Sequence, residues 1–490
     1  MYLPDWVLPF KEPKTEIKLI NGCYYKYEVR YQYNKEKKRT DKVTVRLLGK
    51  ITQDYGFIAS DKDLIRRQAS QLPKVDIKTY GVYHLFSELL SEEIKSLQAV
   101  FRADIIERLL SFSLMRWAYQ SPIKRAANYH IHDFCSEHWS ANTINDKQIS
   151  AALKFVGENR EALVDWMKAQ VGVSAADGNK FVMMDSTHVS TVSEQLGINV
   201  KGYNPDHDFD KQVRLMYMFS AELKQPVYYR LINGNITDIT SMSLCVKEMA
   251  IKDVVFIADK GFYSKTNIEQ LAANQLQYII PLRRNNGLID FSPLLKANFK
   301  KEIKNYFEYQ NRIIWYYQYE KEDIILVTFL DEKLKVKEES DYLLRTKSQP
   351  EAYTEEKFYD RMHGFGTLTL VYQMTGQQTP QQLYQAYKQR NEIEIMFDSY
   401  KNFLNADKMY MQDRHVLEGW IMANFIAMIA YYKLYCRLKT AKMLSTYSPK
   451  DIIELSKSIY QIKIKGTWHR SEMTIKAKTL FNKIGIDYLN

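Results

Sequence analysis

The chain has 490 residues, enough for about three domains, and its 46% hydrophobic and 26% charged residues exclude an intrinsically disordered protein. Its four cysteines are far apart in the sequence, which excludes a disulfide-stapled scaffold or a cysteine-rich zinc module and favours a reducing compartment. The net charge of +11 is concentrated in residues 11–50 (+7) and 421–490 (+8), which indicates either a polyanionic partner such as nucleic acid or a solvated lysine-rich surface.

The N-terminal part of the chain predicts β structure. Its first residues, MYLPDWVLPFK, have neither a basic start nor a long apolar run, so no secretory signal is expected. From Glu16 to Thr52, aromatic and β-branched residues alternate with charged ones on both sides of the polar break NKEKKRTD. We therefore predict a basic β-hairpin within a basic β-rich arm, residues 1–75.

A helical region follows the arm. Residues 82–120 contain no Gly or Pro and repeat apolar residues at helical spacing, and a second helical tract covers about 144–170. The small, polar segment VGVSAADGNK then indicates a linker. We predict that residues 76–177 form a helical region, in which no segment gives a helix-turn-helix signal.

Apolar runs bounded by turn residues dominate the next part of the chain. Residues 178–284 contain five such runs with a helical segment after the third, in the order FVMMDSTHVS, VRLMYMFSAEL, PVYYRLING, TSMSLCVKEMA (the helix), VVFIADKGFYS and QYIIPLRRN. This order predicts a mixed α/β sheet. In residues 285–376 the helical period disappears, and IIWYYQYEKEDIILVTFL and TLTLVYQM predict further strands around a charged turn.

Helices are expected again from Thr379 towards Tyr435, within a segment 377–435, and a basic, helical region 436–490 ends the chain. The longest apolar stretch, Ile421 to Tyr432, is interrupted by Asn424 and is shorter than the roughly 20 residues that span a bilayer. We expect no membrane contact and a cytoplasmic location.

Two aspartates follow apolar runs directly. Asp185 ends the run FVMM and Asp259 ends the run VVFIA, so each carboxylate is expected where a buried strand ends. An acid beside buried apolar residues is costly unless a positive group compensates for it. Each aspartate could equally start a turn or cap a helix.

Four polar residues share one side of the helix expected after Thr379. Tyr387, Arg390, Glu394 and Lys401 are spaced by 3, 4 and 7 residues. At roughly 100° per residue they fall within about 60° of one another. An exposed Arg390–Glu394 ion pair would explain part of this pattern, and Asp398 projects on the same side, so geometry alone does not select the acid.

These residues resemble a known family. Asp185 in MMDST, Asp259 in IADKGFYS and the pattern from Tyr387 to Lys401 are similar to the DDE transposases of bacterial insertion sequences, specifically insertion-sequence family four with its Y-R-E-K signature. The turn GNITD and the hairpin ending LLGKI also resemble segments of that family. The resemblance selects Glu394 over Asp398 as the third acid.

The resemblance implies an α/β fold. An RNase H-like catalytic domain (178–284 and 377–435) would be interrupted by a mostly β insertion (285–376). Asp185 would lie on the first strand, Asp259 after the fourth strand and Glu394 on a late helix. The N-terminal β-hairpin, the helical DNA-binding region and a helical C-terminal tail would surround this core.

Three carboxylates without His or Cys form a hard oxygen site. Such a site suits two Mg²⁺ ions, with Mn²⁺ as a substitute, and paired ions of this kind promote in-line phosphodiester displacement. We expect Asp185 to bridge the two metal ions while Asp259 and Glu394 each hold one.

Six further residues are expected to contact DNA. The resemblance implies that Tyr387, Arg390 and Lys401 grip phosphates beside the scissile bond. Arg283 and Arg284 are candidates because of their charge alone. Trp315 could stack on a flipped base, although an aromatic residue on a β-rich segment more often serves packing.

The function implied is cut-and-paste transposition. The chain would bind double-stranded DNA at the terminal inverted repeats of its element, cleave the strands and join 3′ ends to target DNA. Two ends must be held together, so a homodimer on DNA, associated with the nucleoid, is expected. The alternatives are a non-catalytic DNA-binding or domesticated regulator and an RNase H-like nuclease.

Overall fold

The computed structural model describes residues 3–35, 38–71, 75–139, 144–172, 180–191, 193–201, 211–234, 238–249, 254–376 and 378–488. The chain divides into two compact units, Met1–Ile77 with Ile462–His469 and Lys78–Gln461 with Arg470–Asn490. The division falls within three short strands that form one sheet in the order β18-β17-β5: β5 (Val75–Thr79), β17 (Tyr460–Ile464) and β18 (Thr467–Arg470). The finer domain bounds stay predictions.

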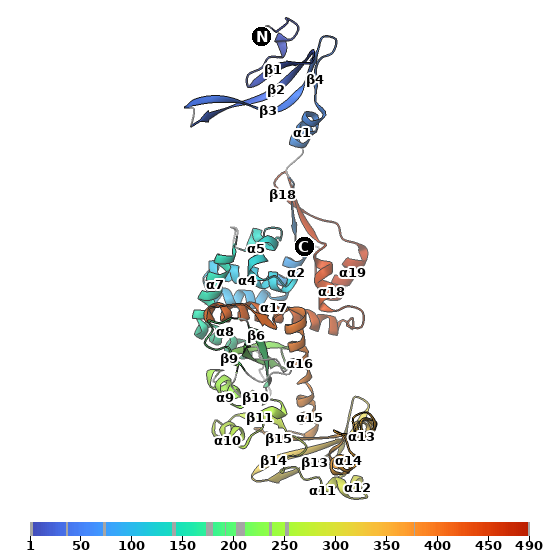
Figure 1. Cartoon of the computed structure of the whole chain (residues 1–490). Helices are drawn as coiled ribbons and strands as arrows, with labels where there is room; N and C mark the ends of the chain where they lie inside the picture. The colour runs from blue at the N-terminus through green and yellow to red at the C-terminus, as the bar shows by residue number, and fades with distance from the viewer. Residues whose placement is uncertain are drawn as a thin grey trace. The chain divides into compact units, whose positions relative to one another are not determined.

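The first unit is built on a four-stranded antiparallel sheet. Its strands, in the order β1-β2-β3-β4, are β1 (Thr15–Ile20), β2 (Cys23–Asn34), β3 (Arg39–Thr52) and β4 (Gly56–Ala59), followed by α1 (Asp61–Gln71). The basic hairpin predicted from the alternating pattern is therefore present as β2 and β3. Strand β1 pairs only with Cys23–Glu28 of β2, and β4 pairs only with Gly49–Thr52 of β3. The other end of the hairpin is a two-stranded ribbon (Figure 1).

Helices begin the second unit, as the apolar spacing predicts. They are α2 (Gly81–Leu89), α3 (Ser91–Val100), α4 (Ala103–Tyr119), α5 (Ile123–His130), α6 (Cys135–His138), α7 (Asp146–Glu158) and α8 (Arg160–Gly172). Most of α4 is buried, and α7 starts at a capping box in which Asn145 and Gln148 satisfy each other's backbone N–H groups. Residues 173–179 of the predicted linker lie outside the described residues.

The sheet of the second unit has the topology that the resemblance implies. Its first elements are β6 (Lys180–Thr191), β7 (Val200–Lys201), β8 (Lys211–Ser220), β9 (Gln225–Asn233), α9 (Asp238–Met249), β10 (Val254–Ile257), η2 (Lys260–Phe262), α10 (Lys265–Ala273) and β11 (Gln277–Pro281). Strand β8 is antiparallel to β6 and β9, whereas β10 is parallel to β6 and β11. Apart from the short β7, the order third-second-first-fourth-fifth is that of an RNase H-like core, so the predicted fold class is confirmed. Residues 235–237 of the GNITD turn lie outside the described residues.

The same sheet continues into the segment 285–376. Its further elements are α11 (Ser292–Leu295), α12 (Phe299–Ile303), β12 (Tyr306–Tyr309), β13 (Arg312–Lys321), β14 (Ile324–Asp331), α13 (Glu332–Ser348), α14 (Glu355–Arg361), η3 (Met362–Gly364) and β15 (Thr367–Gln373). Strand β15 pairs with β11 and joins these strands to the core in an 11-stranded sheet. The predicted strands are present, but α13 was not predicted. This helix buries only Tyr342, so its sequence has no apolar period to detect.

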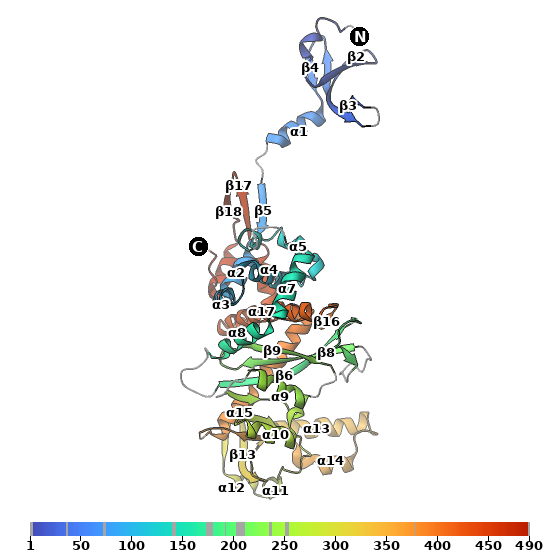
Figure 2. The ribbon, with the colours of Figure 1, turned by 90° about the vertical axis from the view of Figure 1, so that its left-hand side faces the viewer.

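Helices resume after β15. These helices are α15 (Pro380–Lys388), α16 (Asn391–Asp398), α17 (Arg414–Thr440), α18 (Pro449–Ser456) and α19 (Ile475–Lys483). Between α16 and α17 lie the π-helical turn η4 (Ser399–Phe403) and the short strand β16 (Lys408–Met409). Figures 1 and 2 show α9 and α10 on one side of the core strands, and α15 and α16 on the other. Among the described residues, no helix is long and apolar enough to cross a membrane.

Helix α17 packs very closely on α7. A Cβ atom added to Gly157 would lie 2.0 Å from the backbone oxygen of His415, and one added to Gly419 would lie 2.1 Å from that of Leu153. Each glycine therefore lets the backbone of the other helix approach at this crossing.

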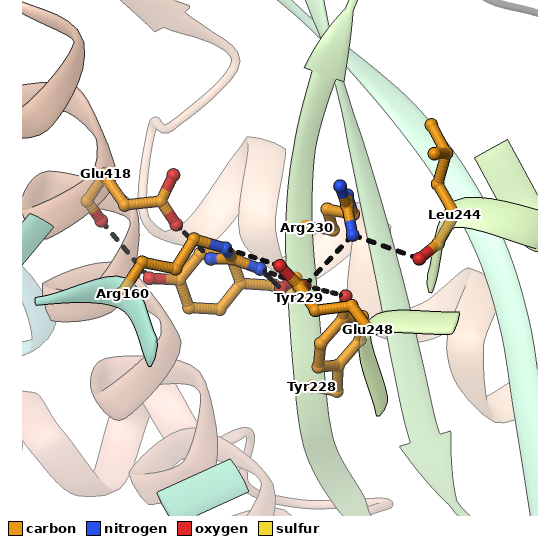
Figure 3. A network of polar contacts seen from close by, with 7 residues as sticks. All are labelled: Arg160, Tyr228, Tyr229, Arg230, Leu244, Glu248 and Glu418. Atoms are coloured by element: carbon orange, nitrogen blue, oxygen red, sulfur yellow. Dashed lines mark hydrogen bonds and ion pairs between the residues drawn. The ribbon is translucent and has the colours of Figure 1, made fainter. Parts of the chain in front are cut away.

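A partly buried ion cluster ties α8, α9 and α17 to β9 (Figure 3). Arg160 pairs with Glu418 and, at 2.8 Å, with Glu248. Arg230 also pairs with Glu248, at 3.3 Å, and the hydroxyl of Tyr228 donates to the same carboxylate. Burial opposes the charge on Arg160, but the carboxylates outweigh it and raise the pKa of Arg160. The cluster holds the helical region on the sheet of the second unit.

Candidate active site

The sheet register brings the two aspartates to the same level. Strands β6 and β10 are adjacent and parallel, and their last pairing joins Met183 to Ile257. Asp185 and Asp259 each lie two residues beyond that pair. Asp185 lies within β6 and Asp259 lies just after the end of β10, so both residues are at the same end of the parallel pairing between the two neighbouring strands. The N–H of Ser186 donates to Oδ1 of Asp185 at 2.8 Å.

One guanidinium contacts all three acids of the predicted triad. Arg390 lies 3.3 Å from Oδ2 of Asp185 and 3.7 Å from Oδ1 of Asp259, and it also pairs with Glu394. Three carboxylates that are remote in the sequence therefore meet within a few ångströms of one side chain. Arg390 itself is mostly buried, whereas Glu394 is exposed at the edge of the cluster.

The helix expected from Tyr387 to Lys401 is not uniform. Tyr387 lies at the end of α15, Arg390 precedes α16, and Lys401 lies in the π-helical turn η4. A spacing of 100° per residue does not hold across these breaks. Among the described residues, no ion pair joins Lys401 to the three acids, and Asp398 accepts a hydrogen bond from Asn402 at 2.6 Å rather than meeting Arg390.

The charges of the cluster act on its tyrosine and arginine. Burial raises the pKa of Tyr387, and Asp259 raises it further against the opposing effect of Arg390. Burial favours the neutral form of Arg390, but Asp259, Tyr387, Asp185 and Glu394 outweigh it and raise the pKa of Arg390. Arg390 is therefore a firmly charged cation.

The donor set of the cluster is suited to a hard divalent cation. It consists of carboxylates alone, without sulfur or imidazole. In the described part of the chain, no group of three or more His, Cys, Asp or Glu side chains is arranged to hold a metal ion. Here the guanidinium of Arg390 occupies the centre, as the positive charge among Asp185, Asp259 and Glu394. Three acids against one arginine leave the cluster an excess of negative charge.

A cavity of about 710 Å³ opens beside the cluster, and Asp259, Tyr387 and Arg390 form part of its wall. Arg283 and Arg284 also line it. Arg283 is exposed, but Arg284 pairs with Glu338 at 2.9 Å and donates to the backbone oxygen of Thr367 at 3.1 Å. The two arginines are adjacent in the sequence, but Arg284 is held by Glu338 and is therefore less available to a ligand than Arg283.

Lys260 also lines this cavity, and sequence reasoning missed it. Its position directly after Asp259 in IADKGFYS was the signal that could have identified it. The side chain is exposed, so its ammonium group is available to an anion in the cavity.

Trp315 lies on β13, away from the cavity wall. Its indole N–H donates to Glu332 at 3.1 Å, its ring packs on Tyr306, and the ammonium group of Lys300 lies 5.6 Å from the ring centre. These contacts give the ring a packing role, and base stacking stays a prediction.

Comparisons with known proteins bear on this site. The family model described as "Transposase DDE domain" matches residues 177–430, more than half of the chain, and this range contains all three acids. A solved structure of the piggyBac transposase synaptic complex with hairpin DNA is similar at 10% identity and a TM-score of 0.40, over 77% of this chain and 79% of that one. The comparison with curated proteins gives no match. The chain belongs to the DDE transposase domain family.

Proposed function

We propose that this transposase binds the terminal inverted repeats of an insertion sequence, cleaves the DNA strands and joins the 3′ ends to target DNA. The observation that carries the proposal is the convergence of Asp185, Asp259 and Glu394 on Arg390. We further propose that the chain is of the insertion-sequence family four type, since the spacing from Tyr387 to Lys401 fits that signature.

Asp185, Asp259 and Glu394 would hold two Mg²⁺ ions, or Mn²⁺ in their place, with Asp185 shared between them. Ions bound there would activate a water or 3′ hydroxyl and stabilise the leaving oxygen of the phosphodiester. The negative excess of the cluster supports this assignment. Arg390 must turn away from the acids for the ions to enter, and its charge would then be free for a DNA phosphate.

The cavity beside the acids is a suitable place for the DNA backbone. Tyr387 and Arg390 lie on its wall, and Lys260 and Arg283 add exposed positive charge. Phosphate contacts from such groups position a duplex without reading its sequence. Arg284, fixed by Glu338, would shape the wall, and Lys401 would contact DNA further along η4.

The homodimer also belongs to this proposal. Excision requires both ends of one element to be held together. Two copies of the active site would therefore act on one complex that contains both DNA ends. A protein that acts on chromosomal DNA in this way would be associated with the nucleoid.

A cleavage assay tests the proposal. The full chain is incubated with Mg²⁺ and a duplex carrying the inverted repeats that flank its gene. Asp185→Asn, Asp259→Asn and Glu394→Gln should each abolish nicking while DNA binding is kept. Glu392→Gln is the matched control, because Glu392 lies on the same helix but pairs with Lys439 at 2.8 Å. Cleavage by Asp259→Asn at the wild-type rate would refute the assignment.

The products separate transposition from its alternatives. Joined products between the 3′ ends and a target plasmid indicate a transposase. Cleavage without joining would indicate a nuclease, and binding without cleavage would indicate a regulator.

A further inference from the structure

The free end of the β2–β3 hairpin has no neighbour in its own sheet. Residues Arg30–Asn34 pair only with Arg39–Val43, beyond the reach of β1 and β4. A two-stranded ribbon is only marginally stable alone in water. Such a ribbon is also narrow enough to enter the major groove of duplex DNA.

Polar side chains cover both faces of this ribbon. On one face, Tyr31 is 62% exposed and Tyr33 is 60% exposed, opposite Lys42 and Thr40. The other face presents Arg30 and Gln32 at alternate positions of β2, both exposed. The large apolar side chains that the ribbon exposes are Tyr31, Tyr33 and Val43, and the two tyrosines, which carry hydroxyl groups, lie on the face opposite Arg30 and Gln32.

The charges of the ribbon are mainly positive. Residues 30–34 and 39–43 contain three cations, Arg30, Arg39 and Lys42, and a single acid, Asp41. Lys42 lies on the face of the tyrosines and pairs with Glu16 of β1 at 3.1 Å. Asp41 accepts hydrogen bonds from Arg39 at 2.9 Å and from Asn34 at 3.0 Å.

Two side chains remain for an external ligand. Over the described residues, neither Arg30 nor Gln32 has a side-chain hydrogen bond or an ion pair. Their chemistry is that of base readers, because arginine matches the acceptors of guanine and glutamine matches adenine in the major groove.

We propose that the ribbon enters the major groove of duplex DNA, where Arg30 and Gln32 contact base edges while Lys42 and Arg39 contact phosphates. This inference rests on the proposed function and names where the chain reads DNA sequence. It places sequence recognition in the first unit rather than in the helical region 76–177.

The test compares two double variants of the full chain. Arg30→Ala with Gln32→Ala removes one cation and one amide from the ribbon. The matched control, Lys62→Ala with Gln53→Ala, also removes one cation and one amide, from exposed positions elsewhere in the unit. The probe is the duplex that the wild-type chain enriches from a random-sequence library, and the library itself is the competitor.

The ribbon variant should bind the enriched duplex about tenfold to a hundredfold more weakly, with a much smaller loss on the library, whereas the control should bind both as the wild type does. Unchanged preference in the ribbon variant would overturn the inference alone. A changed oligomeric state with unchanged DNA affinity would also overturn it, by assigning the ribbon to contact between copies. A wild-type chain that binds no duplex would overturn the proposed function as well.

Discussion

The ion cluster of Arg160 makes a quantitative prediction about stability. Arg160→Met removes the guanidinium that contacts Glu418, Glu248 and the backbone oxygen of Tyr229. Glu418 has 7% of its side chain exposed and has no second ion pair among the described residues. The substitution therefore leaves a buried carboxylate without its partner.

The expected loss follows from these contacts. Removing one partner of a buried ion pair costs about 3–5 kcal/mol, because the remaining charge stays buried. Glu248 keeps Arg230 at 3.3 Å and the hydroxyl of Tyr228, so only one of the two carboxylates is stranded. We therefore expect Arg160→Met to lower the free energy of unfolding by about 3 kcal/mol, near the lower end of this range. Adding Glu418→Gln should restore part of it, because the stranded charge is then removed.

Urea unfolding followed by tryptophan fluorescence measures the loss. Lys154→Met is the control, because Lys154 forms an exposed pair with Asp413 at 2.8 Å, and its midpoint should not change. A loss below about 1 kcal/mol for Arg160→Met, as for an exposed pair, would refute the reasoning. An additive effect of Glu418→Gln would refute it equally.

Three further predictions concern helix packing, pH and the acid cluster. Gly419→Ala should lower the free energy of unfolding in urea by about 1–3 kcal/mol, because the new Cβ meets the backbone of Leu153. Gly287→Ala, where the new Cβ would lie in open space, should leave the free energy of unfolding unchanged. Equal effects of the two substitutions would contradict the close crossing of α7 and α17. Burial lowers the pKa of His130 from 6.5 to about 4, so the unfolded chain binds the proton first and the contribution of His130 to stability should fall by about 3 kcal/mol between pH 6.5 and 4. Burial raises the pKa of Asp133 to about 6, which adds stability over the same range, so the His130 contribution is read from the difference between the wild-type and variant profiles. His130→Gln should flatten this part of the profile, and parallel profiles for variant and wild type would count against it. Arg390→Gln should lower the melting temperature in EDTA, because the three acids lose the cation that they share. Mg²⁺ should restore the melting temperature by binding the acids instead. A melting temperature that stays low in Mg²⁺ would argue against one metal site formed by the three acids.

Much of the fold could be predicted because its elements bury apolar residues in regular patterns. The strands of the core are nearly continuous apolar runs, which is typical of strands covered on both faces. Helix α13 and strands β17 and β18 escaped prediction for the opposite reason. They are short or highly charged, and tertiary contacts rather than apolar periodicity determine their structure.

The site was less predictable than the fold. Asp185 and Asp259 each carried a local signal, but their common level depends on the register that pairs Met183 with Ile257, which only the folded sheet defines. The place of Arg390 among the acids depends on the break between α15 and α16, where the regular helical spacing ends. The sequence pattern and the family resemblance therefore named the candidate residues, whereas the contacts that bring them together could be seen only in the three-dimensional structure.

The central claim is that Asp185, Asp259 and Glu394 hold divalent ions together. Fe²⁺ can replace Mg²⁺ in such oxygen sites, and with peroxide and ascorbate it cleaves the polypeptide backbone next to bound iron. The full chain should be cut near residues 185, 259 and 394 in the same sample, excess Mg²⁺ should suppress all three cuts, and Asp185→Asn should weaken them together. Cuts at only one of these positions, or cuts that persist unchanged in Asp185→Asn, would contradict the account.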